Sequence, residues 1–263
     1  MNKSRALIIA AAVSALGIVI YPQTPNVDGR NILQKVLRAQ HSLSYNSVQE
    51  HTQSLYGQNI RSTITLRHDG RASLGNDRLE SLIYQNYTPL VEGRDHIAGR
   101  DTWVLRLKPK AKHRPWKQLW VDKKTSAVLA SRDWTARNKI KRSMKTVSIH
   151  YIHNNRMSAA PTPDTQPQKL PASLHKMKIP AGFVLTDSET DKSGRSSHCT
   201  YSDGLYSISV NVNQPSAKKS VCNEPMDFGQ GFIYVTRRQG KKVIVIADLL
   251  PEEIAKIAHS SAR

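Results

Sequence analysis

Polar and apolar positions alternate most regularly in the C-terminal third of the chain, in YSDGLYSISVNV, residues 201–212. A Ser-Asp-Gly turn precedes the alternation, and in a strand every second side chain lies on the same face. One face is apolar and carries Tyr206, Ile208, Val210 and Val212. The pattern predicts a half-buried strand that begins directly after a turn.

The first part of the chain predicts one helix followed by a hairpin. Within residues 31–43, the apolar side chains recur at helical spacing: Ile32, Leu33, Val36, Leu37 and Leu43. This spacing is typical of an amphipathic helix. Alternating runs at 45–49 and 60–66 come next, and residues 68–71, His-Asp-Gly-Arg, are a turn signal. We therefore expect a β-hairpin in this region.

More alternating runs follow, and no helical pattern separates them. They contain Trp103, Leu105 and Leu107, then Leu119 and Val121 around Trp120, then 128–131, then Val147, Ile149 and Tyr151. Residues 122–126 are predicted to form a turn between two of these strands. Strands without intervening helices predict an antiparallel sheet, here of six or more strands.

A proline-rich segment divides the chain into two parts. Residues 154–175 contain four prolines and almost no large apolar residue, as a semi-extended linker does. The C-terminal part begins with a strand at 183–185, and later runs at 232–236 and 243–247 flank a turn at 238–241. A final helix is expected to begin at Pro251, with Glu252 and Glu253 in its first turn and Ile254, Ile257 and Ala258 facing inward.

These patterns predict an α+β fold with two domains. We place a signal peptide or N-terminal anchor at 1–24, a β domain at 28–155, the linker at 156–172 and a smaller α+β domain at 173–263. Lys3 and Arg5 precede fifteen apolar residues, which describes a secretory signal. The apolar run is short for a membrane span, and an uncleaved anchor is the alternative. We expect the body of the chain to be exported to the periplasm.

The chain is strongly basic, with 39 Lys and Arg against 20 Asp and Glu and a formal net charge of +19. Residues 101–150 hold fourteen of the cations and three acids. Such an excess favours acidic partners or anionic lipid head groups, although it also serves solubility. Only sixteen aromatic residues are present, without a base-stacking motif, so we expect no nucleic acid.

Two cysteines, Cys199 and Cys222, are the only ones in the chain. In an oxidising compartment an isolated pair is most simply a disulfide, and this is our prediction. Two cysteines without Cys-x-x-Cys spacing do not provide a metal site. His150 and His153 would point to opposite faces of a strand, so they do not provide one either.

No motif for catalysis occurs: the chain lacks Gly-x-Ser-x-Gly, a phosphate-binding loop and His-Glu-x-x-His. The acids Glu50, Asp69, Glu80, Glu92 and Asp122 are scattered at or near predicted turns. We therefore expect no enzyme and no cofactor. Four tryptophans, Trp103, Trp116, Trp120 and Trp134, are interpreted as core packing; a concave face that accepts a lipid tail is the functional alternative.

Four motifs in register resemble the RseB/MucB family of periplasmic regulators of envelope-stress sigma factors. They are IAGR at 97–100 with LWVDKKT at 119–125, PAGF at 180–183, YSDGLYSISVNVN at 201–213 and VIVIADLLPEEIAKIAHS at 243–260. The resemblance covers residues 31–261. It implies a half-open antiparallel β-barrel packed on a helix, similar to LolA and LolB, joined to a smaller α+β domain.

The resemblance also implies a function without catalysis. Such proteins bind the periplasmic segment of a transmembrane anti-sigma factor, shield it from proteolysis, and release it on lipid-like or lipopolysaccharide signals. We expect the partner to dock by adding to a sheet edge near residues 201–213. The predicted partner-binding residues are Tyr201, Asp203, Leu205 and Tyr206, and the predicted rim for lipid or an acidic partner is Lys108, Lys110, Lys112 and Arg114.

Two other interpretations stay open at this point. The large domain alone would carry a lipid or lipoprotein, or the chain would be an enzyme whose polar groups converge only after folding. A regulator gene would stand beside those of a sigma factor and an anti-sigma factor, whereas a carrier gene need not. The oligomeric state is open, with a homodimer as one option.

Overall fold

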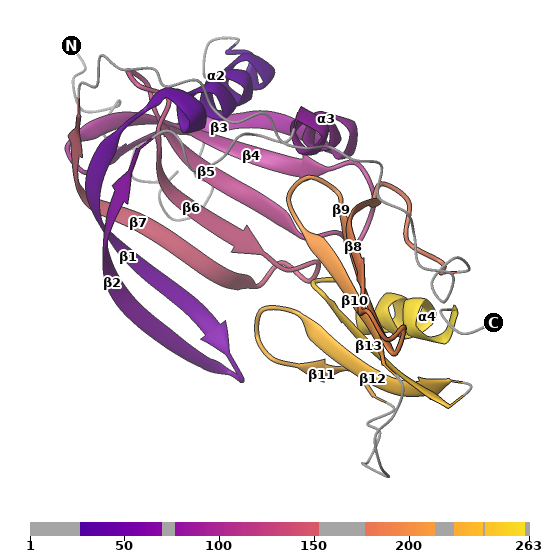
Figure 1. The fold of residues 1–263 in the computed structure, drawn as a ribbon. Coiled ribbons are helices and arrows are strands. Elements are labelled where there is room, and N and C mark those ends of the chain that lie inside the picture. Colours follow the sequence, from indigo (N-terminus) through magenta and orange to yellow (C-terminus); the bar gives the residue numbers. More distant parts are fainter. Residues whose placement is uncertain (1–26, 70–76, 153–176, 214–223, 239, 261–263) are drawn as a thin grey trace, which may run out of the picture.

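The protein folds into two antiparallel sheets with one helix-backed face each (Figure 1). A computed structural model describes residues 27–69, 77–152, 177–213, 224–238 and 240–260. The first sheet and its helices are α2 (Gly29–Ser42), β1 (Tyr45–Leu55), β2 (Gln58–His68), α3 (Asp77–Asn86), β3 (Tyr87–Ile97), β4 (Arg100–Pro109), β5 (Trp116–Asp122), β6 (Val128–Trp134) and β7 (Ile140–Tyr151). The second part holds β8 (Val184–Thr190), β9 (Ser196–Ser202), β10 (Ser207–Asn213), β11 (Met226–Asp227), β12 (Phe232–Arg238), β13 (Lys241–Ala247) and α4 (Pro251–Ser260).

The first sheet has seven strands in the order β2-β1-β7-β6-β5-β4-β3, so the prediction of six or more antiparallel strands is confirmed. The sheet is open, because β2 and β3 each pair on one side. Helix α2 lies where the spacing predicted it, and the Asp28 side chain accepts the Arg30 N–H at its start. Its apolar side chains pack with Leu105 and Leu107 of β4.

The predicted hairpin exists, but its turn is not at 68–71. The turn is Tyr56-Gly57, with φ of 48° and 77°. Two consecutive positive φ values match the right-handed twist of a two-residue hairpin. Glycine at the second position takes such an angle without the steric cost of a side chain.

Helix α3 and strand β3 were absent from the sequence-based expectation. Both lie between 77 and 97, and the prediction that Glu50, Glu80 and Glu92 lie at turns is wrong, since these residues lie in β1, α3 and β3. Pro89 and Gly93 interrupt the strand pattern of β3, which is typical of an edge strand. The edge position of β3 explains why these residues are tolerated there.

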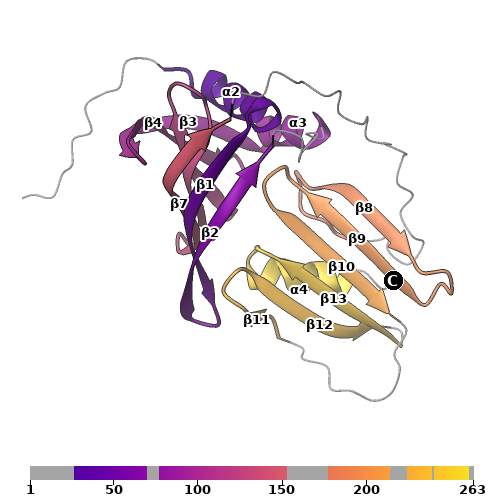
Figure 2. The same cartoon turned by 60° about the vertical axis from the view of Figure 1, so that its left-hand side comes forward.

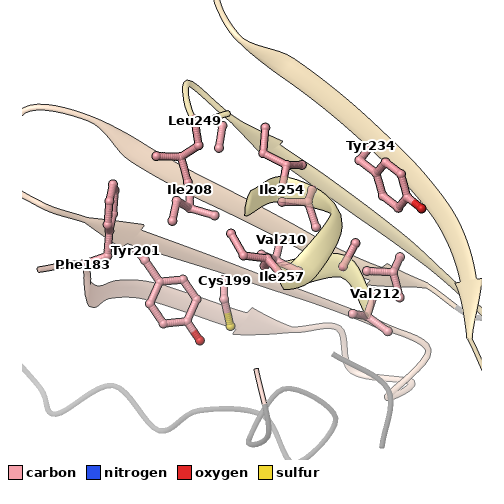
Figure 3. Packing of buried hydrophobic residues seen from close by; sticks show 14 residues of the cluster. Phe183, Cys199, Tyr201, Ile208, Val210, Val212, Tyr234, Leu249, Ile254 and Ile257 are labelled. Atoms are coloured by element: carbon pink, nitrogen blue, oxygen red, sulfur yellow. The ribbon is translucent and has the colours of Figure 1, made fainter. Parts of the chain in front are cut away.

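The second sheet has the order β11-β12-β13-β10-β9-β8, with α4 on one face (Figure 2). The predicted inward residues of α4 are buried, namely Ile254, Ile257 and Ala258. All three belong to one buried cluster with Ile208, Val210 and Val212 of β10, and Figure 3 shows Ile254 and Ile257 against that strand. Strands β9 and β11 were not predicted. No helix in the described ranges is both long and apolar enough to cross a membrane.

Two of the sequence motifs meet in one buried ion pair. Arg100, the last residue of IAGR, donates from Nε to the carboxylate of Asp122, the acid of LWVDKKT. The same carboxylate accepts the Lys124 N–H at 2.9 Å and the hydroxyls of Thr125 and Tyr151 at 2.8 and 3.0 Å. Burial raises the pKa of Asp122, but these donors outweigh it and lower the pKa below its usual value. These motifs therefore anchor a turn.

The lowered pKa of Asp122 predicts an acid-labile contribution to stability. The charged carboxylate stabilises the fold above its unfolded pKa, near 4, and this contribution is lost as pH falls through the lower folded pKa. Asp122→Asn should make the free energy of unfolding, measured by urea denaturation, depend less on pH as the pH falls below about 4. Exposed Asp101→Asn is the control; an unchanged pH slope in Asp122→Asn would contradict the assignment.

Burial predicts which apolar side chains stabilise the second domain. Ile254 is fully buried, whereas Ile64 on β2 is 42% exposed. Ile254→Ala should lower the free energy of unfolding by about 2–5 kcal/mol because it leaves a cavity. Ile64→Ala should change it by less than about 0.5 kcal/mol. Denaturant melts followed by circular dichroism compare the two, and equal losses would contradict the packing described above.

Candidate functional site between the two domains

A turn of the second domain is inserted into the core of the first. Tyr206 is only 8% exposed, and Leu205 lies beside it. Both pack in the apolar cluster formed by α2, α3 and the first sheet, whose buried members include Ile32, Leu33, Val36, Leu37, Ile83, Leu105, Leu107, Leu119 and Val121. We call residues 202–206 the wedge.

The base of the wedge is held by Asp203, which is 3% exposed. Its carboxylate accepts the N–H groups of Leu205 and Tyr206 at 3.0 and 2.9 Å, which shapes the turn. It also accepts the Tyr87 hydroxyl at 2.6 Å. Burial, with the nearby Asp203 charge, raises the pKa of Tyr87, so its hydroxyl stays protonated and donates.

Helix α3 contacts the wedge through backbone as well as side chains. The Asn86 amide donates to the carbonyls of Gly182 and Asp203, both at 2.9 Å. Gly204 has φ +102°, and a Cβ there would lie 2.6 Å from the Ile83 nitrogen. Only glycine permits this approach, which explains the Ser-Asp-Gly sequence of the turn.

A second interdomain contact joins β7 to the end of β13. Lys141 donates from Nζ to the Asp248 carboxylate at 2.5 Å and to the Gln230 carbonyl at 3.3 Å. The same Nζ lies 5.0 Å from the centroid of the Tyr206 ring. Burial raises the pKa of Asp248 despite the Lys141 charge. Gln230 also donates to the Gln53 side chain at 2.9 Å.

A third contact joins the β4–β5 loop to α4. Arg114 Nη1 lies 3.0 Å from both carboxylate oxygens of Glu253, in the first turn of the helix. The Arg114 side chain is 9% exposed, and its guanidinium lies 5.5 Å from the Phe183 ring centroid. The Glu253 side chain is 27% exposed, so this charge-assisted pair is partly buried and helps to orient the two surfaces.

A cavity of about 330 Å³ opens between the domains next to the Lys141–Asp248 pair. We call it the interdomain groove. Its lining comes from the β1–β2 turn, the β6–β7 turn and β11–β12: Ser54, Tyr56, Gly57, residues 135–137, residues 139–141, Asp227, Gly229, Gly231, Phe232 and residues 248–250. Tyr56 and Ile140 are 77% and 45% exposed there. Beyond the Lys141–Asp248 pair, the lining holds Arg137 and Lys139 against Asp227, so the groove is partly apolar with a small excess of positive charge.

The predicted partner-binding residues do not form an open surface. Tyr201 lies in the core of the second domain, while Asp203, Leu205 and Tyr206 belong to the wedge. The expected docking by strand addition near 201–213 does not fit, because β10 is paired with both β9 and β13. The alternation in β10 correctly predicted that one face of the strand is buried. That face is covered by α4 of the same domain and not by a binding partner.

The predicted basic rim is split by the structure. Lys108, Lys110 and Lys112 are exposed, and Lys110 donates to the Tyr84 carbonyl at 2.9 Å. Arg114 is instead occupied by Glu253 in the domain contact. The role of the three lysines toward lipid or an acidic partner stays a prediction.

The predicted disulfide is not formed in this structure. Cys199 is a free, buried thiol on β9, facing the core beneath α4 (Figure 3). Burial raises its pKa to about 11, which keeps the thiol protonated and unreactive at neutral pH. Cys222 lies outside the described residues.

Trp116 and Trp120 are buried, as the core interpretation predicted, whereas Trp103 and Trp134 are only half-buried. Trp116 and Trp134 stack with ring centroids 4.6 Å apart, and the Arg106 guanidinium lies 4.2 Å from the Trp116 centroid. Trp120 is 6% exposed and donates to Asp95. Among the described residues, which include His150 but not His153, no cluster is suited to hold a metal ion.

The sequence pattern does not locate the groove or the wedge. The groove is built from turns at 56–57 and 135–139, whose residues have no periodicity. Tyr206 was assigned to the apolar face of its strand, and nothing in the pattern indicates that it enters the other domain. The interdomain groove and wedge were therefore missed from sequence.

Fold and site together define a two-domain protein whose candidate recognition surface lies between two antiparallel sheets. The profile of the MucB/RseB N-terminal domain matches residues 28–173, and that of the MucB/RseB C-terminal domain matches 169–262. The chain belongs to the MucB/RseB family, as the sequence motifs indicated. A search of curated proteins finds no match.

Solved structures of MucB have the same fold. MucB in complex with MucA(peri) is 19% identical, with a TM-score of 0.64 over 89% of this chain and 98% of that one. The Pseudomonas aeruginosa MucA/MucB complex is 18% identical, with a TM-score of 0.62 over 87% and 97%. MucB alone gives 18% identity and a TM-score of 0.53 over 90% and 98%.

The Tyr87–Asp203 hydrogen bond should contribute measurably to stability. Tyr87→Phe removes the donor and leaves a buried carboxylate oxygen short of a partner, which should cost about 1–3 kcal/mol in urea denaturation. Tyr84→Phe is the matched control, because the Tyr84 hydroxyl is buried without a hydrogen-bond partner among the described residues. Equal effects of both variants would contradict a specific role for the bond.

Proposed function

We propose that the protein is a periplasmic negative regulator that binds the periplasmic segment of a transmembrane anti-sigma factor. Membership of the MucB/RseB family over both domains supports this function. The two complexes of MucB with MucA, which this chain matches over nearly its whole length, support the kind of partner. Binding shields the segment from proteolysis, and lipid-like envelope-stress signals release it. The protein performs no catalysis in this scheme.

The observation that carries the proposal on this chain is the interdomain groove. Exposed Tyr56 and Ile140 provide apolar contact area, and aromatic anchors of this kind dominate binding energy at interfaces. Arg137 and Lys139 lie in the same lining, whereas Lys141 is already paired with Asp248. An extended segment with apolar side chains and nearby carboxylates fits this chemistry.

The net charge of the chain supports the same partner class. A formal charge of +19 draws acidic segments toward the protein over distances beyond direct contact. The exposed Lys108, Lys110 and Lys112 contribute to this attraction without lining the groove. Steering by these lysines should be sensitive to salt, whereas apolar contacts in the groove are not.

A lipid or lipoprotein carrier is the second candidate, and one feature of the large domain favours it. Ile60, Ile64 and Leu66 on the edge strand β2 are 45%, 42% and 38% exposed. Their even spacing places all three on one face of the strand. An apolar row on an open sheet edge offers a surface to an acyl chain.

The first experiment is a pull-down from envelope extract with the mature chain, with mass spectrometry of both proteins and extractable lipids. The proposed function requires a single-span protein that carries a cytoplasmic sigma-binding domain. Its periplasmic segment is then produced alone and titrated by calorimetry. Recovery of lipid or lipoprotein without such a protein supports the carrier and contradicts the regulator.

Charge reversal locates the binding surface. The double variant Arg137→Glu/Lys139→Glu should weaken the segment's binding by about tenfold or more, because it places acids in the groove beside an acidic segment. Lys108→Glu/Lys112→Glu changes the net charge by the same amount at the exposed end of β4 and in the loop after it, and should weaken binding by less than about threefold at physiological salt. A larger loss of binding in the lysine variant than in the groove variant would place the binding site at those lysines and contradict the groove.

A further inference from the structure

A polar cleft runs between helices α2 and α3 of the first domain. Two hollows of about 510 Å³ and 670 Å³ meet there, since both are lined by Arg30, Glu80 and Tyr84. The first hollow also reaches Arg38 along α2, and the second reaches Lys110 after β4. We call the two hollows together the helix cleft.

The helix cleft lies far from the interdomain groove. None of its lining residues lines the groove. Helix α2 ends at Ser42, shortly before β1 begins, whereas the groove is lined by Ser54 at the other end of that strand (Figure 1). A strand of this length spans roughly 30 Å. A ligand of the helix cleft is therefore independent of the groove and of the proposed function.

Two arginines of α2 line the cleft without an ion pair. Arg30 and Arg38 are exposed, and neither guanidinium has a carboxylate partner among the described residues. Their positions in the chain place them about 12 Å apart along the helix axis. Gln34 lies midway between them and lines the same wall. Side chains that can donate hydrogen bonds thus follow one another along α2.

The two carboxylates of the cleft already have partners. Asp28 accepts the Arg30 N–H at 2.9 Å and caps the start of α2. The Glu80 carboxylate lies 3.3 Å from His41 Nε2. With Lys110, the lining holds three cations against these two acids. The groups left for a ligand are therefore mainly donors.

A buried hydroxyl adds another donor. The Tyr84 hydroxyl has no hydrogen-bond partner among the described residues, and the Arg30 guanidinium lies 5.2 Å from the centroid of the Tyr84 ring. Burial, together with the Glu80 charge, raises the pKa of Tyr84, so the hydroxyl stays protonated at neutral pH. An unpaired buried hydroxyl costs free energy, and a ligand acceptor that meets it removes this cost.

We propose that the helix cleft binds an extended acidic segment of another protein, in which carboxylates at positions i and i+4 pair with Arg30 and Arg38 above Tyr84. In an extended chain, side chains at i and i+4 lie on the same face, about 13 Å apart. This distance matches the separation of the two arginines along α2. Each guanidinium can hold a carboxylate through two parallel hydrogen bonds. Arg30 turns from the Tyr84 ring toward the first carboxylate, and the hydroxyl then donates to the chain between the two acids.

The separation of the arginines favours a chain over a single small anion. One carboxylate or phosphate ion would have to draw both long side chains together. Two carboxylates on one chain meet each arginine where it stands, and the second contact then forms within a complex that already exists. The net charge of +19 attracts acidic segments of any spacing, so spacing is the property that distinguishes a site from general attraction.

A pair of peptides tests the spacing. A fluorescein-labelled peptide of serine and threonine with glutamates at i and i+4 is titrated with the protein and followed by fluorescence anisotropy. Moving the second glutamate to i+3 turns it to the other face of the extended chain and should weaken binding by about tenfold. Equal affinity of the two peptides, or no binding of either, overturns the proposal.

Substitution of the arginines tests the location. Arg30→Gln/Arg38→Gln should weaken binding of the i, i+4 peptide by about tenfold or more, because charge-assisted hydrogen bonds are lost. Lys35→Gln/Arg78→Gln removes the same charge from exposed positions of the same two helices outside the cleft, and should change the affinity by less than about twofold. Equal losses in both variants show long-range attraction alone and overturn the site.

The Tyr84 hydroxyl separates binding from folding. Tyr84→Phe should weaken peptide binding by about threefold, because the ligand loses a donor, while the free energy of unfolding stays unchanged. An unchanged affinity contradicts the placement of the chain above Tyr84.

Inorganic phosphate distinguishes carboxylate from phosphoryl chemistry. Phosphate should displace the labelled peptide only at concentrations well above those of the unlabelled peptide. Displacement at lower concentrations overturns the acidic peptide as the occupant. Because the anti-sigma segment is absent from these titrations, their failure leaves the proposed function intact, and a failed pull-down leaves the peptide result unaffected.

Discussion

Burial of the Asp203 carboxylate at the domain boundary is the constraint on which the arrangement of the molecule depends. One oxygen shapes the turn through two backbone N–H groups, and the other accepts the Tyr87 hydroxyl of the first domain. A buried charge is tolerated only when such donors surround it. Two of these donors belong to the turn itself and the third, the Tyr87 hydroxyl, belongs to the first domain, so the carboxylate has all three donors only with the domains together.

The interface combines an apolar insertion with polar surroundings. Leu205 and Tyr206 complete a core that α2 and the first sheet leave incomplete, whereas Arg114, Lys141 and Gln230 make directional contacts around them. The apolar part provides affinity between the domains, and the directional part fixes their register. The interdomain groove owes its shape to that register, since its walls come from both domains.

The family motifs serve this architecture in different ways. Arg100 of IAGR and Asp122 of LWVDKKT are separated in sequence, but their side chains meet in a network that holds the β5–β6 turn. The Gly182 carbonyl of PAGF accepts the Asn86 amide, and the Ser-Asp-Gly turn forms the wedge. None of these residues lines the groove. The closing motif at 243–260 differs, because its Asp248, Leu249 and Leu250 line the groove beside turns that lie outside the motifs.

Local patterns determined much of this protein. Each of these elements must bury one face, and this need produces a periodic pattern that can be recognised in the sequence. The pattern is helical at 31–43 and 254–258, and alternating in β4, β5, β10 and β13. Helix α3 and strand β3 could not be recognised in this way. The helix is short, and Pro89 and Gly93 interrupt the alternation of the strand. Tertiary structure alone decided that Tyr206 enters the first domain, that Cys199 faces its own core as a free thiol, and that Arg114 meets Glu253. A strand's period specifies which face is buried, but not which partner buries it.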